Sequence, residues 1–275
     1  MSTDRLVVIG KVVRNFLLSV YALFAMFPLV WMVIVSFKSD AEVLTTTFIF
    51  NPTLVNYNKV LLGTDYLKCF LDNIIVSGGA VVIGVLVGVP AAYAFARYNF
   101  KAKEFLAFNI LSFRFAPEIL VILPLFMIYQ KLGLYDTYYG LIWVYQLITL
   151  PLLIWVVRGY FEDISVEIEQ AAQLDGYPWY HVFVKVLLPL IRPGLVAASL
   201  LAFIFAWNSF TFSLQLSGFR ITTNTVASLR YLASDSVHYG QVAVCAVVSA
   251  LPEVIMALLI QKHLVRGLSF GAVKG

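Results

Sequence analysis

The chain has 275 residues, of which 61% are hydrophobic and only 12% are charged, and its mean hydropathy is +0.88. Because a soluble domain is about 25% charged, this composition leaves too little polar surface for a water-soluble protein and predicts an integral membrane protein. The net charge of +4 comes from no basic cluster, which argues against nucleic-acid binding. The two cysteines, Cys69 and Cys245, stand far apart and form neither a metal-binding spacing nor a disulfide framework.

The first long apolar stretch, residues 15–37, follows a short arm that carries Arg5, Lys11 and Arg14. It holds about 23 uncharged residues, enough to cross roughly 30 Å of hydrocarbon. A basic start followed by an apolar run is also typical of a cleaved signal peptide. This run is longer than the core of such a peptide, and no small-residue cleavage site follows it. We therefore expect the first transmembrane helix here.

Five further apolar segments have the length of a membrane span. They are residues 73–96, 105–130, 138–157, 194–215 and 241–261. The third segment is unusual, because Arg114, Pro117 and Glu118 lie within it. The sequence thus predicts an all-α membrane protein, with six transmembrane helices in one domain that covers residues 1–275.

The distribution of Lys and Arg predicts that both termini are cytoplasmic. Six spans put the two termini on the same side of the membrane. Twelve of the 19 Lys and Arg residues fall on that side, six fall on the other, and Arg114 lies within a span. Since cytoplasmic segments carry the excess of positive residues, this side is the cytoplasm. The same orientation makes residues 158–193 a long cytoplasmic segment.

Residues 158–193 combine carboxylates with apolar residues at helical spacing. Apolar residues recur from Ile164 to Leu174 and again from Tyr180 to Leu188. Asp175-Gly176 stands between the two patterns, where a glycine ends one helix and lets the chain turn into the next. The segment is predicted to be a helix-turn-helix. Its apolar stripe must be buried against the membrane surface, against its own bundle or against a soluble partner.

No motif for catalysis or nucleotide binding is present. The sequence contains no glycine-rich phosphate loop, no G-x-S-x-G elbow and no H-E-x-x-H zinc pair. His181, His238 and His263 fall at different sides or ends of the predicted bundle. We expect a protein that is not an enzyme and binds no metal or cofactor, so any energy from a nucleotide must come through another chain.

Polar residues inside the spans are candidates for a solute pathway. A charge near mid-bilayer costs about 2.5–3.5 kcal/mol, so it should face a cavity or a partner. Arg114 and Glu253 are expected at similar depth in the third and sixth spans, and Glu118 shares the helix face of Arg114. These charges either lock the bundle as an ion pair or line the pathway. Three residues of the fifth span join the candidates: Trp207, Asn208 and Gln215.

The cytoplasmic segment resembles the EAA signature of ABC importer permeases. The match runs Glu169-Gln170-Ala171-Ala172-Gln173-Leu174-Asp175-Gly176, with Leu188-Pro189 and Pro193 downstream. In that family the segment is a coupling helix that inserts into a cleft on the ATPase subunit. The resemblance implies ATPase contacts by the following residues: Glu169, Gln170, Ala171, Ala172, Asp175, Gly176, Leu188 and Pro189.

One position departs from the family pattern. Gln170 stands where a glutamate normally precedes the paired alanines, and Glu169 comes one residue earlier. On a helix, Glu169 would face about 100° away from that position. The polar contact to the ATPase is therefore made either by Glu169 after a small rotation or by Gln170 as an uncharged substitute.

Other motifs resemble the carbohydrate branch of this family, typified by the second permease subunit of the maltose importer. They are Phe27-Pro28-Leu29-Val30-Trp31, Gly133-Leu134-Tyr135-Asp136-Thr137, Trp207-Asn208 and the ending Gly267-Leu268-Ser269-Phe270-Gly271-Ala272-Val273-Lys274-Gly275. In such subunits the tail can reach the ATPase dimer, which implies weaker contacts by Gly271, Val273 and Lys274. The family transports sugars, polyols and related small solutes such as glycerol phosphates.

The resemblance implies a permease subunit of an ATP-driven importer, with the type I ABC importer fold, in the bacterial inner membrane. Its implied partners are a second permease subunit, two subunits that bind ATP and Mg, and an extracytoplasmic solute-binding protein. An alternative is a secondary transporter driven by an ion gradient, against which stand the coupling segment and the lack of an inverted repeat. A polytopic membrane enzyme is a further alternative, but no cluster of catalytic side chains is expected at one depth.

Overall fold

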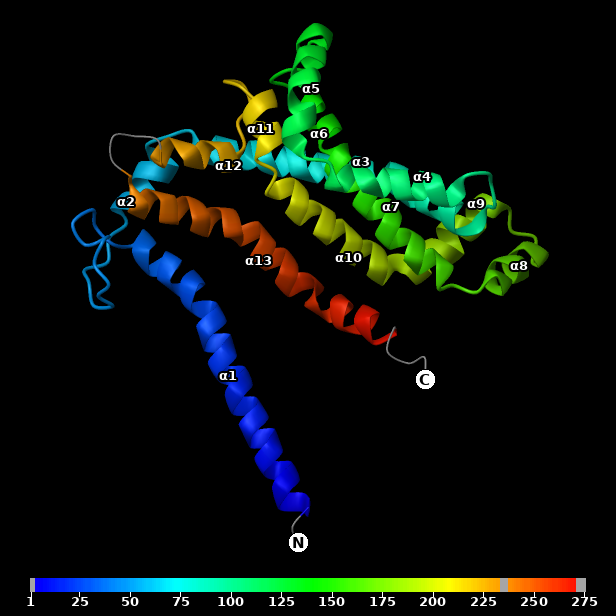
Figure 1. The fold of residues 1–275 in the computed structure, drawn as a ribbon, viewed down its shortest axis with the longest axis horizontal. Helices are drawn as coiled ribbons and strands as arrows, with labels where there is room; N and C mark the ends of the chain where they lie inside the picture. Colours follow the sequence, from blue (N-terminus) through cyan, green and yellow to red (C-terminus); the bar gives the residue numbers. More distant parts are fainter. Residues whose placement is uncertain (1–2, 233–236, 271–275) are drawn as a thin grey trace. The chain divides into compact units, whose positions relative to one another are not determined.

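A computed structural model of the chain describes residues 3–232 and 237–270. Within these two ranges all regular secondary structure is helical (Figure 1), which confirms the predicted all-α fold. The chain divides into two compact units. Unit 1 comprises residues 3–65 and the described part of 228–250, and unit 2 comprises residues 66–227 and 251–270.

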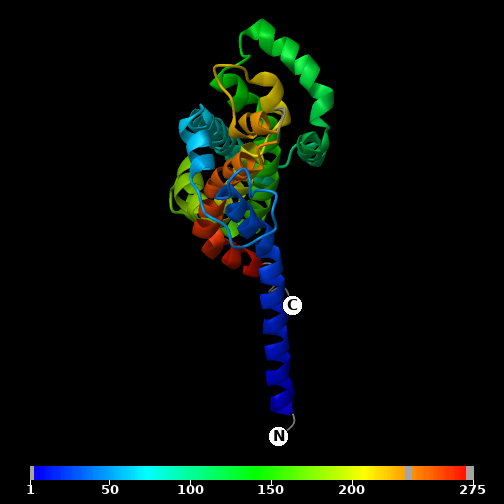
Figure 2. The same cartoon turned by 90° about the vertical axis from the view of Figure 1, so that its left-hand side faces the viewer.

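Unit 1 contains one long N-terminal helix, a polar loop and several short helical turns. Its elements are α1 (Thr3–Ser36), α2 (Val55–Tyr57), η1 (Asn58–Leu62), η4 (Ser228–Tyr231) and the first part of α13 (Tyr239–Phe270), which continues into unit 2. α1 runs without interruption in both ribbon views (Figures 1 and 2). From residue 10 to residue 30 all its side chains are exposed in this chain. A helix that is apolar all round belongs in a membrane or against another chain, which fits the first predicted span.

A buried lysine organises the loop that follows α1. Lys38 is fully buried, and its Nζ donates a hydrogen bond to the carbonyl of Thr45 at 2.7 Å. The same ammonium group lies 4.7 Å from the ring centroid of Trp31, a cation–π contact that compensates part of its desolvation. Asn56 donates to the carbonyls of Ser36 and Lys38, at 3.2 and 2.7 Å. These contacts hold the loop against the end of α1.

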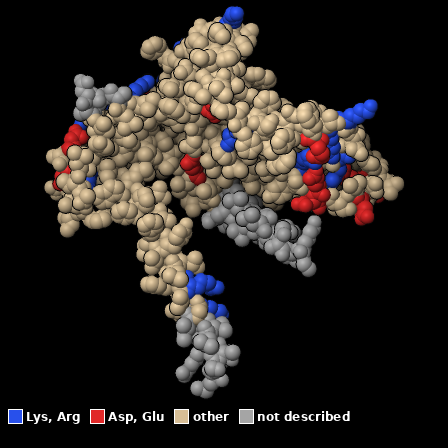
Figure 3. Space-filling view, in the orientation of Figure 1, with Lys and Arg blue, Asp and Glu red and all other residues tan. Residues whose placement is uncertain are grey.

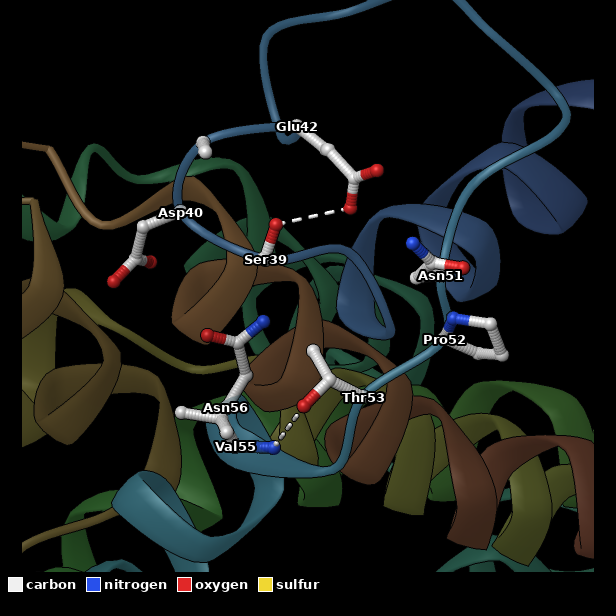
Figure 4. A pocket seen from close by; sticks show the side chains of 9 residues that line it. Ser39, Asp40, Glu42, Asn51, Pro52, Thr53, Val55 and Asn56 are labelled. Carbon is white, nitrogen blue, oxygen red and sulfur yellow. Dashed lines mark hydrogen bonds between the residues drawn. The ribbon is translucent and has the colours of Figure 1, made fainter.

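The same loop encloses a polar cavity of about 600 Å³ (Figure 4). Ser39 donates to the carboxylate of Glu42 at 2.9 Å, and Asp40 forms an ion pair with Lys59 at 3.0 Å. The side chains of Ser39, Asp40 and Glu42 are thus engaged with neighbours inside unit 1. They account for the way the loop folds back on itself.

Unit 2 contains most of the helices. They are α3 (Tyr66–Arg97), α4 (Lys103–Ser112), η2 (Phe113–Phe115), α5 (Glu118–Leu132), α6 (Tyr138–Val144), α7 (Gln146–Glu162), α8 (Val166–Leu174), α9 (Trp179–His181), η3 (Val182–Leu187), α10 (Leu188–Trp207), α11 (Thr211–Leu216), α12 (Asn224–Ala227) and the remainder of α13. Helices α3, α7 and α10 pack against one another around a core that includes Val89, Leu153, Val157, Ile191 and Ala198. This three-helix core is the frame that carries α8.

Small residues let α3 approach α7 closely. A Cβ atom built on Gly84 would lie 2.8 Å from Cδ1 of Leu153 and 3.1 Å from Oγ1 of Thr149. Leu153 and Thr149 are both fully buried, so neither can move into free space. The glycine is therefore required by the contact between the two helices, as is typical of small residues in membrane bundles.

Four helical segments are each long and apolar enough to cross a membrane: Gly10–Ser36, Tyr66–Arg97, Trp179–Trp207 and Tyr239–Leu258. Two further candidates are bent pairs, Lys103–Phe115 with Glu118–Leu132 and Tyr138–Val144 with Gln146–Glu162. Counting each pair as one span makes six. The first pair bends by 93°, and Figure 2 shows α5 leaving α4 at a steep angle. Pro117 explains this break, because a proline forces the residue before it out of the helix, and Ala116 is extended.

The helix that corresponds to the fifth predicted span begins earlier than the sequence pattern predicts. Pro178 is extended and precedes a helical run, α9–η3–α10, that continues from Trp179 to Trp207. The second helix of the predicted helix-turn-helix is therefore the start of this long run. The run ends at Asn208, and α11 follows as a separate short helix, so residues 194–215 are not one helix.

We predict that Gly84→Val weakens the folded bundle, whereas Gly78→Val does not. A valine at position 84 must displace buried Leu153 or Thr149, and such overpacking costs about 1–3 kcal/mol. A Cβ at Gly78 would meet nothing within 4 Å, so that variant is the control for adding the same side chain to α3. The measurement is the thermal stability of the purified protein in detergent. Equal midpoints for the two variants would contradict the close contact between α3 and α7.

Candidate functional site

The helix of the predicted coupling segment is α8, a short helix with well-defined ends. Ser165 caps its N-terminus, where the side-chain oxygen accepts a hydrogen bond from the backbone N–H of Glu167 at 3.3 Å. Glu167 and Glu169 lie in the first turn, where negative charge is favoured by the helix dipole. Local sequence chemistry therefore specifies where this helix starts.

Gly176 ends α8 in the way the sequence predicts. Its φ is +88°, in the left-handed region that side chains rarely adopt. The N–H of Gly176 donates to the carbonyl of Gln173 at 3.0 Å, and the N–H of Tyr177 donates to the carbonyl of Ala172 at 3.2 Å. These two bonds form a Schellman motif, which satisfies the last carbonyls of the helix.

Glu169 points into the protein rather than outward. Its carboxylate accepts hydrogen bonds from Nε of Arg97 and from the hydroxyl of Tyr93, the latter at 3.1 Å. Arg97 also donates through Nη2 to the carbonyl of Ile164 at 2.8 Å. The side chains of Arg97 and Glu169 are only 10% and 7% exposed, so this is a buried ion pair. The pair joins α8 to the end of α3.

The opposite face of α8 is exposed. Gln170, Ala171 and Leu174 lie about 100°, 200° and 140° around the helix from Glu169, and all three are exposed. Leu174 is 88% exposed, which is unusual for a large apolar side chain. Ala172 faces the other way and packs against the core between α3, α7 and α10. Of the two residues that the sequence left open, Gln170 lies on the free face.

The remaining predicted coupling residues lie around the ends of α8 and α10. Asp175 caps the C-terminus of α8, is exposed and donates its N–H to the carbonyl of Ala171 at 3.0 Å. Leu188 is partly buried against the core, whereas Pro189 is exposed in the first turn of α10. The predicted tail contacts, Gly271, Val273 and Lys274, lie outside the described residues.

Acidic and basic side chains gather at the end of unit 2 that carries α8 and α9 (Figure 3), and Arg158 forms ion pairs with Glu104 and Glu162. The guanidinium of Arg158 makes two parallel hydrogen bonds to the carboxylate of Glu104, at 2.7 and 3.0 Å. It makes a third to Glu162 at 2.7 Å. This bidentate geometry joins the start of α4 to the end of α7.

Two of the predicted pathway residues share a small cavity in unit 2. Arg114 and Glu118 line a space of about 200 Å³ beside the break between η2 and α5. The guanidinium carbon of Arg114 lies 3.9 Å from the ring centroid of Phe205, in a cation–π contact. Glu118 lies in the first turn of α5, where the helix dipole stabilises its charge.

The other pathway candidates have separate environments. Asn208 donates from Nδ2 to the carboxylate of Glu253, and in the described part of the chain no salt bridge joins Glu253 to Arg114. Trp207 is buried, with its ring stacked on Phe203 at 5.6 Å. Gln215 is exposed on α11. The structure therefore groups Arg114 with Glu118 and Asn208 with Glu253, and it places Trp207 in the core.

Two aspartates that were not among the predicted site residues hold the segment after α11. Asp136 accepts hydrogen bonds from the backbone N–H groups of Gly218, Arg220 and Ile221, at 2.9, 3.0 and 3.0 Å. Its own φ is +55°, so the residue lies in a tight turn. The sequence feature that predicts this turn is an aspartate directly before Thr137, the N-cap of α6. Short polar side chains such as that of aspartate tolerate a positive φ.

The second of these residues is Asp72, in α3. It accepts hydrogen bonds from the hydroxyl of Tyr138 at 2.7 Å, from Nζ of Lys68 at 3.0 Å and from the N–H of Thr222 at 3.3 Å. Residues 221–224 are all buried. The first part of the predicted loop between the fifth and sixth spans is thus packed into unit 2 rather than extended from it.

The described residues contain no group of three or more His, Cys, Asp or Glu side chains that could hold a metal ion. A capped helix exposes one face and is tied to the bundle by the other, and charged groups lie beside helix breaks.

Comparison with known families places these features in a wider group. Residues 81–270 match the family described as Binding-protein-dependent transport system inner membrane component. Over 95% of its length the chain also has the fold of a solved structure, a chain of a bacterial ABC transporter involved in the import of the acidic polysaccharide alginate. The match has a TM-score of 0.77 and 25% sequence identity, and it covers 98% of that chain.

Curated relatives match along almost the whole chain. The trehalose transport system permease protein SugB of Mycobacterium tuberculosis is 34% identical, over 92% of this chain and 93% of that protein. The trehalose/maltose transport system permease protein MalG of Thermococcus litoralis is 35% identical over the same shares. The sulfoquinovosyl glycerol transport system permease protein SmoH of Agrobacterium fabrum is 29% identical, over 97% of this chain and 95% of that protein.

We predict that Asn208 and Glu253 contribute jointly to stability, whereas Arg114 and Glu253 contribute separately. In a double-mutant cycle with Asn208→Ala and Glu253→Gln, the coupling free energy should be about 0.6–1.7 kcal/mol, the range for polar pairs in membrane bundles. The matched cycle with Arg114→Met and Glu253→Gln should give nearly additive effects. Unfolding titrations of the purified protein in mixed micelles measure both cycles. A larger coupling for Arg114 would instead favour the ion pair that locks the bundle.

Proposed function

The chain belongs to the family of binding-protein-dependent transport system inner membrane components, with the type I fold of ABC importer permeases, and from this we propose how it transports its solute. It forms one half of the translocation pathway in an ATP-driven importer. Residues 1–275 act as a single transmembrane domain with six crossings, in which each bent helix pair serves as one span. The protein is a transport subunit, and the covalent chemistry of ATP takes place in other chains.

The proposed partners are suggested by the missing phosphate loop and by the exposed apolar surface of the spans. It contains no phosphate loop, so two partner subunits bind ATP and Mg and hydrolyse the nucleotide. A second permease subunit completes the pathway and covers part of the exposed apolar surface of the spans. An extracytoplasmic binding protein delivers the solute. The excess of Lys and Arg on one side supports an inner-membrane orientation with both termini in the cytoplasm.

The solute is a sugar, a polyol or a related small polar molecule. Support comes from relatives that transport trehalose, trehalose and maltose, and sulfoquinovosyl glycerol. The charged and amide side chains in the spans suit such solutes, which need hydrogen-bond donors and acceptors. Arg114 and Glu118 would line the path at the cavity beside the helix break, and Asn208, Gln215 and Glu253 would contribute polar groups elsewhere along it. Trp207, which is buried, would pack behind these polar side chains.

The observation that carries the proposal is the exposed face of α8. This face presents the polar side chain of Gln170, the small side chain of Ala171 and the large apolar side chain of Leu174. The other face of the helix is fixed to the bundle. A narrow cleft on an ATPase subunit could receive such a face and bury Leu174. Asp175, Gly176 and Pro189 lie beside it, and Gly271, Val273 and Lys274 are proposed as weaker contacts. Closure of the ATPase dimer would then move α8 and switch the pathway.

We predict that Gly176→Val lowers ATPase binding and solute uptake, whereas Gly176→Asn has a much smaller effect. The backbone at this position has a φ of +88°, and an L-residue there costs roughly 1–2 kcal/mol. Valine is β-branched and cannot relieve this strain, but asparagine tolerates the left-handed region. A turn that rearranges to relieve this strain must restore it on docking, and since each 1.4 kcal/mol is a factor of ten, we expect a roughly tenfold weaker ATPase association for Gly176→Val.

The two variants carry side chains of similar size, and a Cβ at Gly176 meets nothing within 4 Å inside this chain. Any difference between them therefore reports the turn rather than bulk. The measurements are retention of the ATPase subunits during purification and ATP-driven uptake of trehalose and maltose into proteoliposomes. Normal ATPase retention in Gly176→Val would count against docking through α8.

A further inference from the structure

Tyr93 lies where four helical elements of unit 2 meet. It belongs to α3, and its ring contacts Phe161 at the end of α7 and Phe183 in η3, with centroid distances of 5.4 and 5.1 Å. Its hydroxyl donates to Glu169 of α8 at 3.1 Å. One turn further along α3, Arg97 binds the other oxygen of the same carboxylate. These contacts converge on a single buried point.

From this geometry we propose that Tyr93, Arg97 and Glu169 form a latch that transmits movement of α8 to the membrane helices. The inference rests on the proposed docking of the outer face of α8 to an ATPase subunit. Glu169 is then a positioning residue: it does not contact the ATPase but fixes α8 to α3. This role differs from the ATPase contact that the sequence pattern implied for Glu169.

The latch is rigid because each of its charged groups is both buried and paired. Arg97 is shared between the Glu169 carboxylate and the carbonyl of Ile164, on the link that leads into α8. Removing one partner of a buried pair leaves an uncompensated charge, so the arrangement resists opening. By contrast, the neighbouring Glu167 is exposed on the same helix. Of the two carboxylates in the first turn, only that of Glu169 therefore attaches α8 to α3.

Helix α3, to which the latch attaches α8, extends through unit 2. α3 has 32 residues, which corresponds to about 48 Å of helix. Near its other end, Asp72 holds Tyr138 and the backbone of Thr222, and Asn73 donates to the carbonyl of Trp207. A displacement of α8 is thus applied to one end of a continuous helix whose other end holds α6, α10 and the segment after α11.

The test is Glu169→Gln, which keeps the shape of the side chain and removes its charge, in the complete importer in lipid. Two quantities separate docking from transmission. Retention of the ATPase subunits reports docking, and stimulation of ATP hydrolysis by the purified solute-binding protein of the same importer reports transmission through the spans. We expect retention to stay normal while stimulation falls roughly fivefold or more, in line with typical coupling between distant sites.

Glu167→Gln is the matched control for transmission, because it makes the same chemical change on an exposed side chain of the same turn, and it should leave the stimulation of the retained ATPase unchanged. Tyr93→Phe is a milder second variant, which keeps the ion pair and the aromatic contacts and should lower stimulation in the same direction. Unchanged stimulation in both Glu169→Gln and Tyr93→Phe would overturn the proposal. Loss of ATPase retention in Tyr93→Phe as well as in Glu169→Gln would also overturn it, because these residues would then serve docking rather than transmission. Failure of the docking proposal itself would appear separately, as normal retention in Gly176→Val.

Discussion

The buried ion pair between Arg97 and Glu169 is the constraint on which the placement of α8 depends. A helix of nine residues is too short to be stable alone in water, so its position must come from tertiary contacts. Ala172 supplies apolar packing, and the ion pair supplies direction, because a guanidinium and a carboxylate fit in few orientations. Tyr93 and the carbonyl of Ile164 complete the hydrogen bonds of the two charges. Without these partners, the desolvation of both groups would oppose burial.

Helix breaks are the second organising feature of unit 2. α4 and η2 end before Pro117, and α10 ends at Asn208, so backbone groups lose their helical partners at both places. In a membrane such groups are tolerated only where protein or a cavity surrounds them. The polar candidates occur at these breaks: Arg114 and Glu118 flank the first, and Asn208 with its partner Glu253 marks the second. The helix breaks and these polar side chains therefore occur at the same two places in unit 2.

Several features could be predicted from the sequence because they depend on local chemistry. The apolar runs in α1, α3 and α13 are long enough to read as spans, and Gly176 signals the turn after α8. Other features depend on neighbours that are distant in sequence. Asn208 to Phe210 interrupt an apolar run without a proline, so the end of α10 was not visible in the pattern. The burial of Trp207 and the hydrogen bonds of Asp136 likewise follow from packing that composition does not encode.

The inward direction of the Glu169 side chain explains why an uncharged residue, Gln170, lies on the outer face of α8. Two carboxylates lie in the first turn of α8, and the one at position 169 is neutralised by Arg97 inside the bundle. The face proposed to enter the ATPase cleft then carries an amide, a methyl group and an exposed leucine, together with the exposed carboxylate of Glu167, about 160° around the helix from Glu169. Association through such a face would draw on apolar burial, at about 25 cal/mol per Å², rather than on charge pairing. The position of Glu169, one residue before Gln170, thus places its carboxylate on the inner side of the helix and leaves the uncharged amide of Gln170 on the outer side.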